Sequence, residues 1–123
     1  MNGISVVADT NIIVYMLNGN KRIAELLNGK EVYLSFVTEL ELFGKRTLSP
    51  AEKKKIQSFL NECIIIDINT SIKRAVINLR EQYKLKLPDA IIVATALEYS
   101  LPLFTADKQM GTVTELKSFI IEI

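Results

Sequence analysis

The chain has 123 residues, with 49% hydrophobic and 24% charged side chains, which is ordinary for a folded protein of one domain, predicted here over residues 1–123. It carries 15 basic and 14 acidic residues, no histidine and one cysteine. This composition excludes an internal disulfide, histidine acid–base catalysis and a Cys–His nucleophile pair. No segment reaches the roughly 18 apolar residues that a membrane helix needs, so we expect a cytoplasmic protein without a membrane partner.

Strands and helices are predicted to alternate along the chain. Strands are expected at 4–8, 32–35, 64–68, 102–105 and 119–123. Helices are expected at 11–17, 21–28, 36–46, 50–62, 71–84, 88–99 and, as a short turn, 107–110. The best marked helix start is Ser49-Pro50-Ala51-Glu52, which combines a capping serine, an early proline and a capping-box glutamate. Such alternation predicts an α/β fold with a mainly parallel sheet covered on both faces.

Four carboxylates lie at the edges of apolar segments, where acids are uncommon. Asp9 and Asp107 each follow a predicted strand, and Asp89 opens the apolar helix Ala90–Leu97. Glu41 belongs to the helix at 36–46, where we expect it to face the core and Glu39 to be the exposed neighbour. Because ligands bind at the carboxyl ends of parallel strands, we expect the four acids to converge. Their mutual repulsion would then call for a divalent cation.

Each acid also has a purely structural interpretation. Asp9 and Asp107 could cap the segments that follow them, and Asp89 could complement a helix dipole. Thr38 and Glu41 fit a capping box, although Ser35 directly ends a strand and is the better cap. Singly these signals are weak, and their joint placement is stronger.

Basic residues surround the candidate acids in the sequence. Without those four acids, ten acidic residues face 15 basic ones, so the remainder of the chain is clearly positive. Arg80, Lys84 and Lys86 lie just before Asp89, and we expect them to contact the backbone phosphates of a polyanion, with a solvated helix face as the alternative.

The chain resembles the PIN-domain ribonucleases, and most of all the VapC-like toxins of toxin–antitoxin pairs. The resemblance rests on Val6–Ile12, Ser35–Leu42, Leu87–Ala96 and Leu103–Asp107. It implies a three-layer α/β/α sandwich, Mg²⁺ or Mn²⁺ as cofactor, RNA as substrate, an antitoxin partner and a homodimer. Within that family pattern, Asp9, Glu41, Asp89 and Asp107 are the catalytic and metal-binding acids, supported by Thr10, Asn11 and Thr105. Met110 stands where many relatives have an aromatic residue, and we expect it to affect packing.

Two other interpretations stay open at this point. One is a PIN fold without catalytic activity that serves as a binding module. The other is a phospho-acceptor receiver domain, in which Asp67, at the end of a predicted strand, would be the phosphorylated residue. A receiver domain would need a second acid after the first strand, where Thr10 stands.

Overall fold

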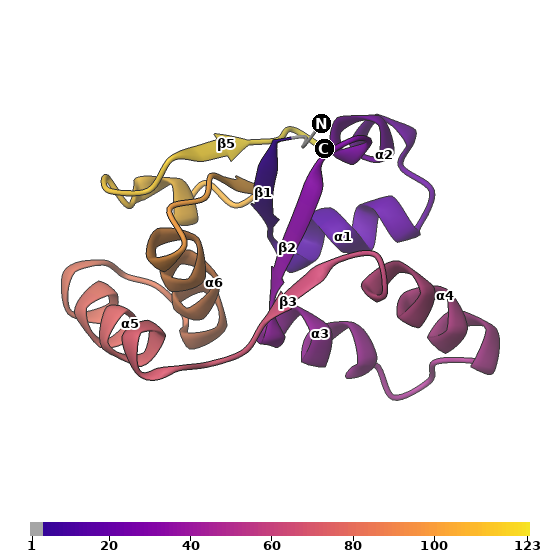
Figure 1. The fold of residues 1–123 in the computed structure, drawn as a ribbon, viewed down its shortest axis with the longest axis horizontal. Coiled ribbons are helices and arrows are strands. Elements are labelled where there is room, and N and C mark those ends of the chain that lie inside the picture. Colours follow the sequence, from indigo (N-terminus) through magenta and orange to yellow (C-terminus); the bar gives the residue numbers. More distant parts are fainter. Residues whose placement is uncertain (1–3) are drawn as a thin grey trace.

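A computed structural model describes residues 4–123 of the chain (Figure 1). Strands and helices alternate as the sequence predicts. In chain order they are β1 (Ser5–Ala8), α1 (Thr10–Leu17), α2 (Lys21–Leu27), β2 (Glu31–Ser35), α3 (Phe36–Phe43), α4 (Pro50–Leu60), β3 (Ile64–Ile66), α5 (Thr70–Gln82), α6 (Leu87–Glu98), β4 (Leu103–Thr105), the 3₁₀ helix η1 (Met110–Thr112) and β5 (Ser118–Ile120). No helix within residues 4–123 has the length and apolar character that a membrane crossing requires.

The five strands form one sheet in the order β3-β2-β1-β4-β5, and every neighbouring pair is parallel. The strand order therefore reverses between β1 and β4, which lie side by side with Val7 opposite Leu103. In open parallel sheets, such a reversal leaves a crevice at the carboxyl ends of the two strands, and ligands bind there. The residues that follow β1 and β4 are thus placed where a site is expected.

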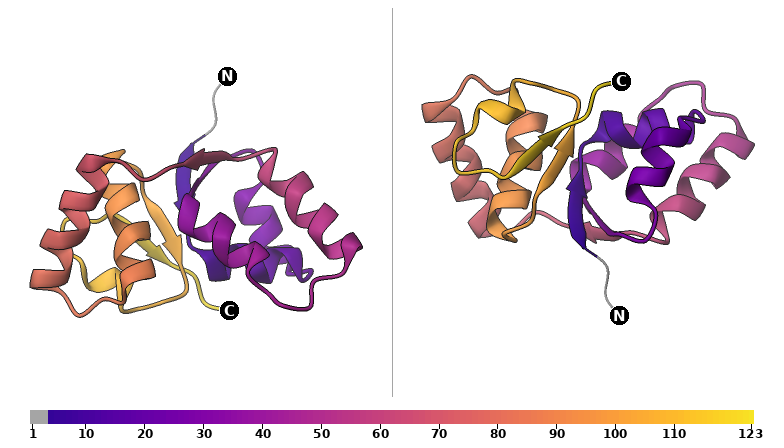
Figure 2. Two further views of the ribbon diagram at one scale, coloured as in Figure 1. Left: turned by 90° about the horizontal axis from the view of Figure 1, so that it is seen from below. Right: turned by 90° about the horizontal axis from the view of Figure 1, so that it is seen from above.

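Helices cover both faces of the sheet and produce the predicted three layers (Figures 1 and 2). Val7 points to the face covered by α5, α6 and η1, and its neighbours Val6 and Ala8 point to the face covered by α1, α2 and α4. This alternation follows from the two-residue period of a strand. Helix α3 contributes Val37 to the first core cluster and Leu42 to the second.

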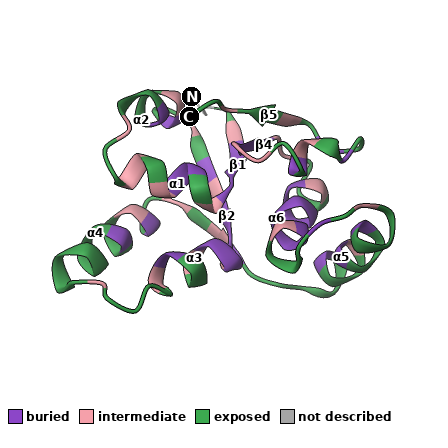
Figure 3. Cartoon of the chain, turned by 180° about the vertical axis from the view of Figure 1, so that it is seen from behind, coloured by how far each residue is buried: buried purple, intermediate pink, exposed green. Residues whose placement is uncertain are grey.

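Helix α6 is buried on all sides through its central turns, as its apolar sequence indicates. Every residue from Ala90 to Ala96 is buried, and the outer helix α5 shields it from solvent (Figures 1 and 3). The Thr95 hydroxyl remains satisfied there because it donates a hydrogen bond of 2.8 Å to the carbonyl of Ile91. A helix packed this firmly fixes the position of the residues in its first turn.

The expected capping signals are present. Ser49 and Glu52 form a reciprocal capping box at the start of α4. Ser35 caps α3 by accepting a hydrogen bond of 3.1 Å from the backbone N–H of Val37, so Thr38 is not the cap. Gly29, after α2, has φ +75°, a conformation that glycine adopts without strain.

Several predicted boundaries were wrong. Strand β3 ends at Ile66 rather than Ile68, and the side chain of Asp67 instead accepts a hydrogen bond from the backbone N–H of Ile68. Helix α3 ends at Phe43, three residues before its predicted end, and β5 stops at Ile120. The short helix expected at 107–110 is instead a turn followed by η1.

Candidate active site

Asp9 lies directly after β1 and is almost completely buried, with 4% of its surface exposed. Its backbone N–H donates to the carbonyl of Phe104 on β4 at 2.9 Å. Its Oδ2 accepts a hydrogen bond of 2.8 Å from the buried hydroxyl of Thr105. Although Asp9 occupies the capping position of α1, its side chain makes no capping hydrogen bond. The capping interpretation therefore does not account for this carboxylate.

Asp107 lies two residues after β4 and is half-buried. Its backbone N–H donates to Thr105 Oγ1 at 2.9 Å, so one threonine hydroxyl is bonded to both Asp9 and Asp107. Asp107 Oδ1 accepts a hydrogen bond of 2.8 Å from the backbone N–H of Gln109. This hydrogen bond agrees with the capping role that the sequence allowed for Asp107. The second carboxylate oxygen of Asp107, Oδ2, makes no hydrogen bond within residues 4–123.

Asp89 lies in the first turn of α6 and is half-buried. Burial raises the pKa of its carboxyl group, and the charges of Asp107 and Glu41 raise it further, while nearby Lys86 lowers it. Asp89 is therefore within electrostatic range of two other candidate acids. The buried body of α6 holds this carboxylate at the crevice.

Glu41 is exposed and Glu39 is half-buried, which is the reverse of our expectation from the sequence. The buried positions of α3 are Val37, Thr38 and Leu42, so the core-facing stripe runs along a different side of the helix. Glu41 lies at the edge of that stripe, one turn after Thr38. From this edge it accepts a hydrogen bond of 2.7 Å from the Thr10 hydroxyl.

The predicted supporting residues separate into two groups. Thr10 and Thr105 each bind a candidate acid through a hydroxyl. Asn11 is exposed in the first turn of α1, and its side chain makes no hydrogen bond with the described part of the chain. Met110 is fully buried, and its sulfur lies 3.6 Å from Thr105 Oγ1, so it packs beneath the site.

Burial and neighbouring negative charge both disfavour the ionised forms of Asp9 and Asp89. Burial raises the pKa of Asp9 to about 6, although hydrogen bonds from the Thr105 hydroxyl and from the Thr10 backbone N–H lower it. The charges of Asp89 and Asp107 add to the upward shift. Carboxylates that raise one another's pKa are stabilised by a cation.

The donor set suits a hard divalent cation, since every candidate ligand is a carboxylate or hydroxyl oxygen. Within residues 4–123, no three acidic side chains are already close enough together to hold an ion. Mg²⁺ commonly binds through one or two carboxylates and keeps several water ligands. The residues present therefore fit such an ion with water completing its coordination.

The three predicted phosphate contacts have different environments. Lys86 is close enough to Asp89 to lower the pKa of that acid. Lys84 is exposed, and its carbonyl accepts a hydrogen bond of 3.1 Å from the Gln109 side chain. Arg80 uses its Nε to donate to the carbonyl of Leu85 at 3.4 Å, so it also supports the loop that carries both lysines.

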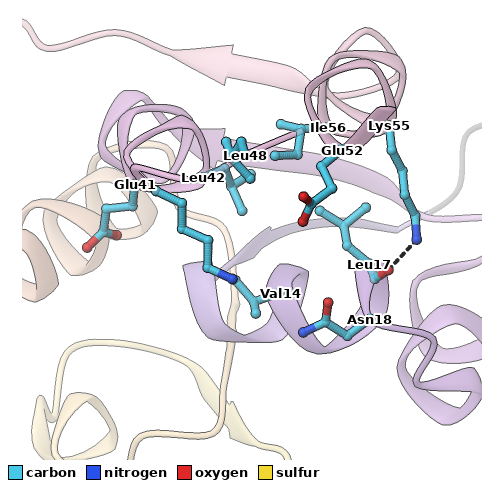
Figure 4. Close-up of a pocket in the computed structure, with 10 residues that line it drawn as sticks. Val14, Leu17, Asn18, Glu41, Leu42, Leu48, Glu52, Lys55 and Ile56 are labelled. Atoms are coloured by element: carbon cyan, nitrogen blue, oxygen red, sulfur yellow. Dashed lines mark hydrogen bonds between the residues drawn. The ribbon is translucent and has the colours of Figure 1, made fainter. Parts of the chain in front are cut away.

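A cleft of about 140 Å³ runs from Glu41 between α1, α3 and α4 (Figure 4). Charged side chains from α3 and α4 line it together with apolar ones. Its lining consists of Val14, Leu17, Asn18, Glu41, Leu42, Lys45, Leu48, Glu52, Lys55 and Ile56. Glu41, whose charge raises the pKa of Asp89, is the one candidate acid that lines this cleft.

Sequence reasoning did not assign site roles to Thr38 and Gln109. Thr38 is buried, and its hydroxyl lies 2.9 Å from that of Thr10. Gln109 holds Asp107 through its backbone and the Lys84 carbonyl through its side chain. The three-residue spacing between Thr38 and Glu41, which we interpreted only as a possible capping box, was the sequence signal available for Thr38. No sequence pattern marked Gln109.

The sheet topology contradicts the interpretation of this chain as a receiver domain. Receiver domains have strand order 2-1-3-4-5, whereas this sheet has β3 at an edge, beside β2. Asp67 follows that edge strand and is exposed, and among residues 4–123 its side chain bonds only to the backbone N–H of Ile68. It is a strand-end residue.

Comparisons with known proteins agree with the fold. The family model for the PIN domain matches residues 6–116. A toxin–antitoxin complex from Klebsiella pneumoniae has 29% identity and a TM-score of 0.81, covering 94% of this chain and 99% of the other. FitAcB from Neisseria gonorrhoeae has 25% identity and a TM-score of 0.76, covering 93% and 96%. DNA-bound VapBC from Salmonella typhimurium has 14% identity and shares the fold, with a TM-score of 0.81 and coverage of 96% of this chain and 98% of the other. No curated protein matches the sequence.

Proposed function

This chain belongs to the PIN-domain family, and on that premise we propose that it is a metal-dependent endoribonuclease and the toxin of a toxin–antitoxin pair. The observation that carries the proposal is the convergence of acids where the strand order reverses. Asp9 follows β1, Asp107 follows β4, and Asp89 enters from α6 within electrostatic range of both.

The role of the acids in this proposal is to bind one or two Mg²⁺ or Mn²⁺ ions. Asp9 is the central ligand, because it is the most buried of the four acids and the Thr105 hydroxyl holds its carboxylate in place. Asp89, Asp107 and Glu41 complete the set directly or through water. When bound, such a cation activates the attacking water and neutralises charge on the scissile phosphate.

The remaining polar groups position the acids and the substrate. Thr105 orients Asp9 and receives the backbone N–H of Asp107, which couples the loops after β1 and β4. Lys86 and Lys84 offer charge to the RNA backbone at the mouth of the site. The free amide of Asn11 is available to a phosphate oxygen.

We propose two protein partners as well. The cognate antitoxin is supported by the solved relative at 29% identity, which is a toxin–antitoxin complex. A homodimer is supported by exposed apolar residues in the C-terminal half, namely Tyr99, Phe119, Ile120 and Ile123. Light scattering of the purified chain, alone and with the product of an adjacent small gene, tests both partners.

The activity is tested by incubating the purified chain with single-stranded RNA in Mn²⁺, Mg²⁺ or EDTA. We expect internal cleavage with either ion and none with EDTA. A chain that binds RNA but leaves it intact under every condition would instead be a binding module with a PIN fold. Equal cleavage with and without EDTA would contradict metal dependence.

A further inference from the structure

Two hydroxyl groups link the buried side of α3 to Glu41. Thr10 Oγ1 donates a hydrogen bond of 2.7 Å to Glu41 Oε1, and it lies 2.9 Å from Thr38 Oγ1. A hydroxyl has a single proton. Because Thr10 gives its proton to Glu41, the contact between the two threonines requires Thr38 to be the donor. The bonds therefore run in one direction, from Thr38 to Thr10 to Glu41.

The two ends of this chain of bonds differ in exposure. Thr38 has no exposed surface, whereas Glu41 is exposed and would otherwise sample several rotamers. A donor locked in the core can fix the rotation of the Thr10 hydroxyl, and that hydroxyl then fixes one oxygen of Glu41. Side chains behind the ligands of a metal site act in this way, by orienting the ligands.

We propose that Thr38 is a positioning residue, which acts through Thr10 to hold the Glu41 carboxylate toward the cation. The inference rests on the proposed function, in which Glu41 is one of the ligands. Thr38 itself touches neither substrate nor ion. Its contribution is to keep Thr10 from turning its proton away from Glu41.

The decisive substitution is Thr38→Val, which keeps the shape of the side chain and removes the donor. We expect Mn²⁺ affinity, measured by calorimetry, and kcat for cleavage of a randomised single-stranded RNA pool each to fall by about 10-fold. KM for RNA should change little. Thr38→Ser keeps the donor and should restore both quantities toward the wild type.

Two further variants separate positioning from general damage. Thr95→Val removes another fully buried hydroxyl, which donates to the Ile91 carbonyl within α6, and should leave Mn²⁺ affinity and cleavage unchanged. In a Thr10→Val background, adding Thr38→Val should have no further effect, because residues that act in series are not additive. Full additivity of the two substitutions would overturn the linkage.

The outcomes also separate this inference from the proposed function. Wild-type protein that binds Mn²⁺ but cleaves no RNA would refute the nuclease assignment, and Mn²⁺ affinity would still test Thr38. Wild-type protein that cleaves RNA, with Thr38→Val matching it in both assays, would refute the inference alone. Absence of Mn²⁺ binding by the wild type would refute both.

Discussion

Thr105 donates a hydrogen bond of 2.8 Å to Asp9 Oδ2 across 96 residues of sequence, and both side chains are buried. This bond joins the ends of β1 and β4 at the point where the strand order reverses. It also lowers the pKa of Asp9, against the larger upward effect of burial. The pair therefore connects the sheet topology to the charge state of the site.

Removing the donor of this bond should make the Asp9 carboxylate harder to ionise. We expect Thr105→Val to raise the pKa of Asp9 further above about 6, because the variant loses the Thr105 hydrogen bond that lowers this pKa and keeps the burial that raises it. Carbonyl-selective NMR of Asp9 measures the titration, and Thr105→Ser is the matched control. An unchanged titration in Thr105→Val would show that the hydroxyl does not interact with the ionised acid.

The raised pKa of Asp9 also predicts how stability depends on pH in EDTA. Folded protein binds this proton more tightly than unfolded protein, so the contribution is present below pH 3.8 and is lost as pH rises through about 6. Asparagine does not ionise, so Asp9→Asn avoids this loss of stability and should raise the free energy of unfolding at pH 7 by up to ~3 kcal/mol. Urea unfolding of both proteins at pH 4 and pH 7 tests this, and a gain that is the same at both pH values would contradict it.

Ligand linkage gives a separate prediction for added cations. Saturating Mg²⁺ or Mn²⁺ at 100 times its Kd should stabilise the wild type by about 2.7 kcal/mol. Asp9→Asn should lose most of this effect while staying folded. Thermal unfolding with and without the ion measures it, and equal stabilisation of the two proteins would remove Asp9 from the ligand set.

Glu41 and Glu39 should differ sharply in their importance for cleavage. Glu41→Gln removes a charged ligand and should reduce cleavage to background, whereas Glu39→Gln should leave cleavage intact. Because Ser35 caps α3, loss of a cap cannot explain a defect in Glu41→Gln. RNA cleavage assays of the two variants decide, and similar activity in both would remove Glu41 from the site.

Lys84 and Lys86 should contribute to RNA binding and not to the chemical step. Replacing both by alanine should weaken binding and flatten its salt dependence by about 0.7 in log–log slope for each lost contact. Cleavage at saturating RNA should persist. The control replaces Lys53 and Lys54, two exposed lysines on α4. A salt slope equal to that of the wild type would show that the two lysines contact no phosphate.

The sequence predicted the fold and the order of its elements, because its strand and helix signals are local. The capping box at Ser49 and the apolar length of α6 are examples. The orientation of Glu41 could not be predicted, because it depends on which side of the short helix α3 packs between two core clusters. The Thr38–Thr10 contact and the Gln109–Lys84 bond join distant segments, and neither segment carries a local signature of them.

The most direct test of the central claim compares RNA cleavage by Asp9→Asn and Asp67→Asn over a Mg²⁺ titration. Both substitutions remove one carboxylate that follows a strand, but only Asp9 lies at the reversal between β1 and β4. We predict that Asp67→Asn cleaves like the wild type, with the same Mg²⁺ dependence, and that Asp9→Asn is inactive at every Mg²⁺ concentration. Wild-type cleavage by Asp9→Asn would contradict a cation-binding active site built around Asp9.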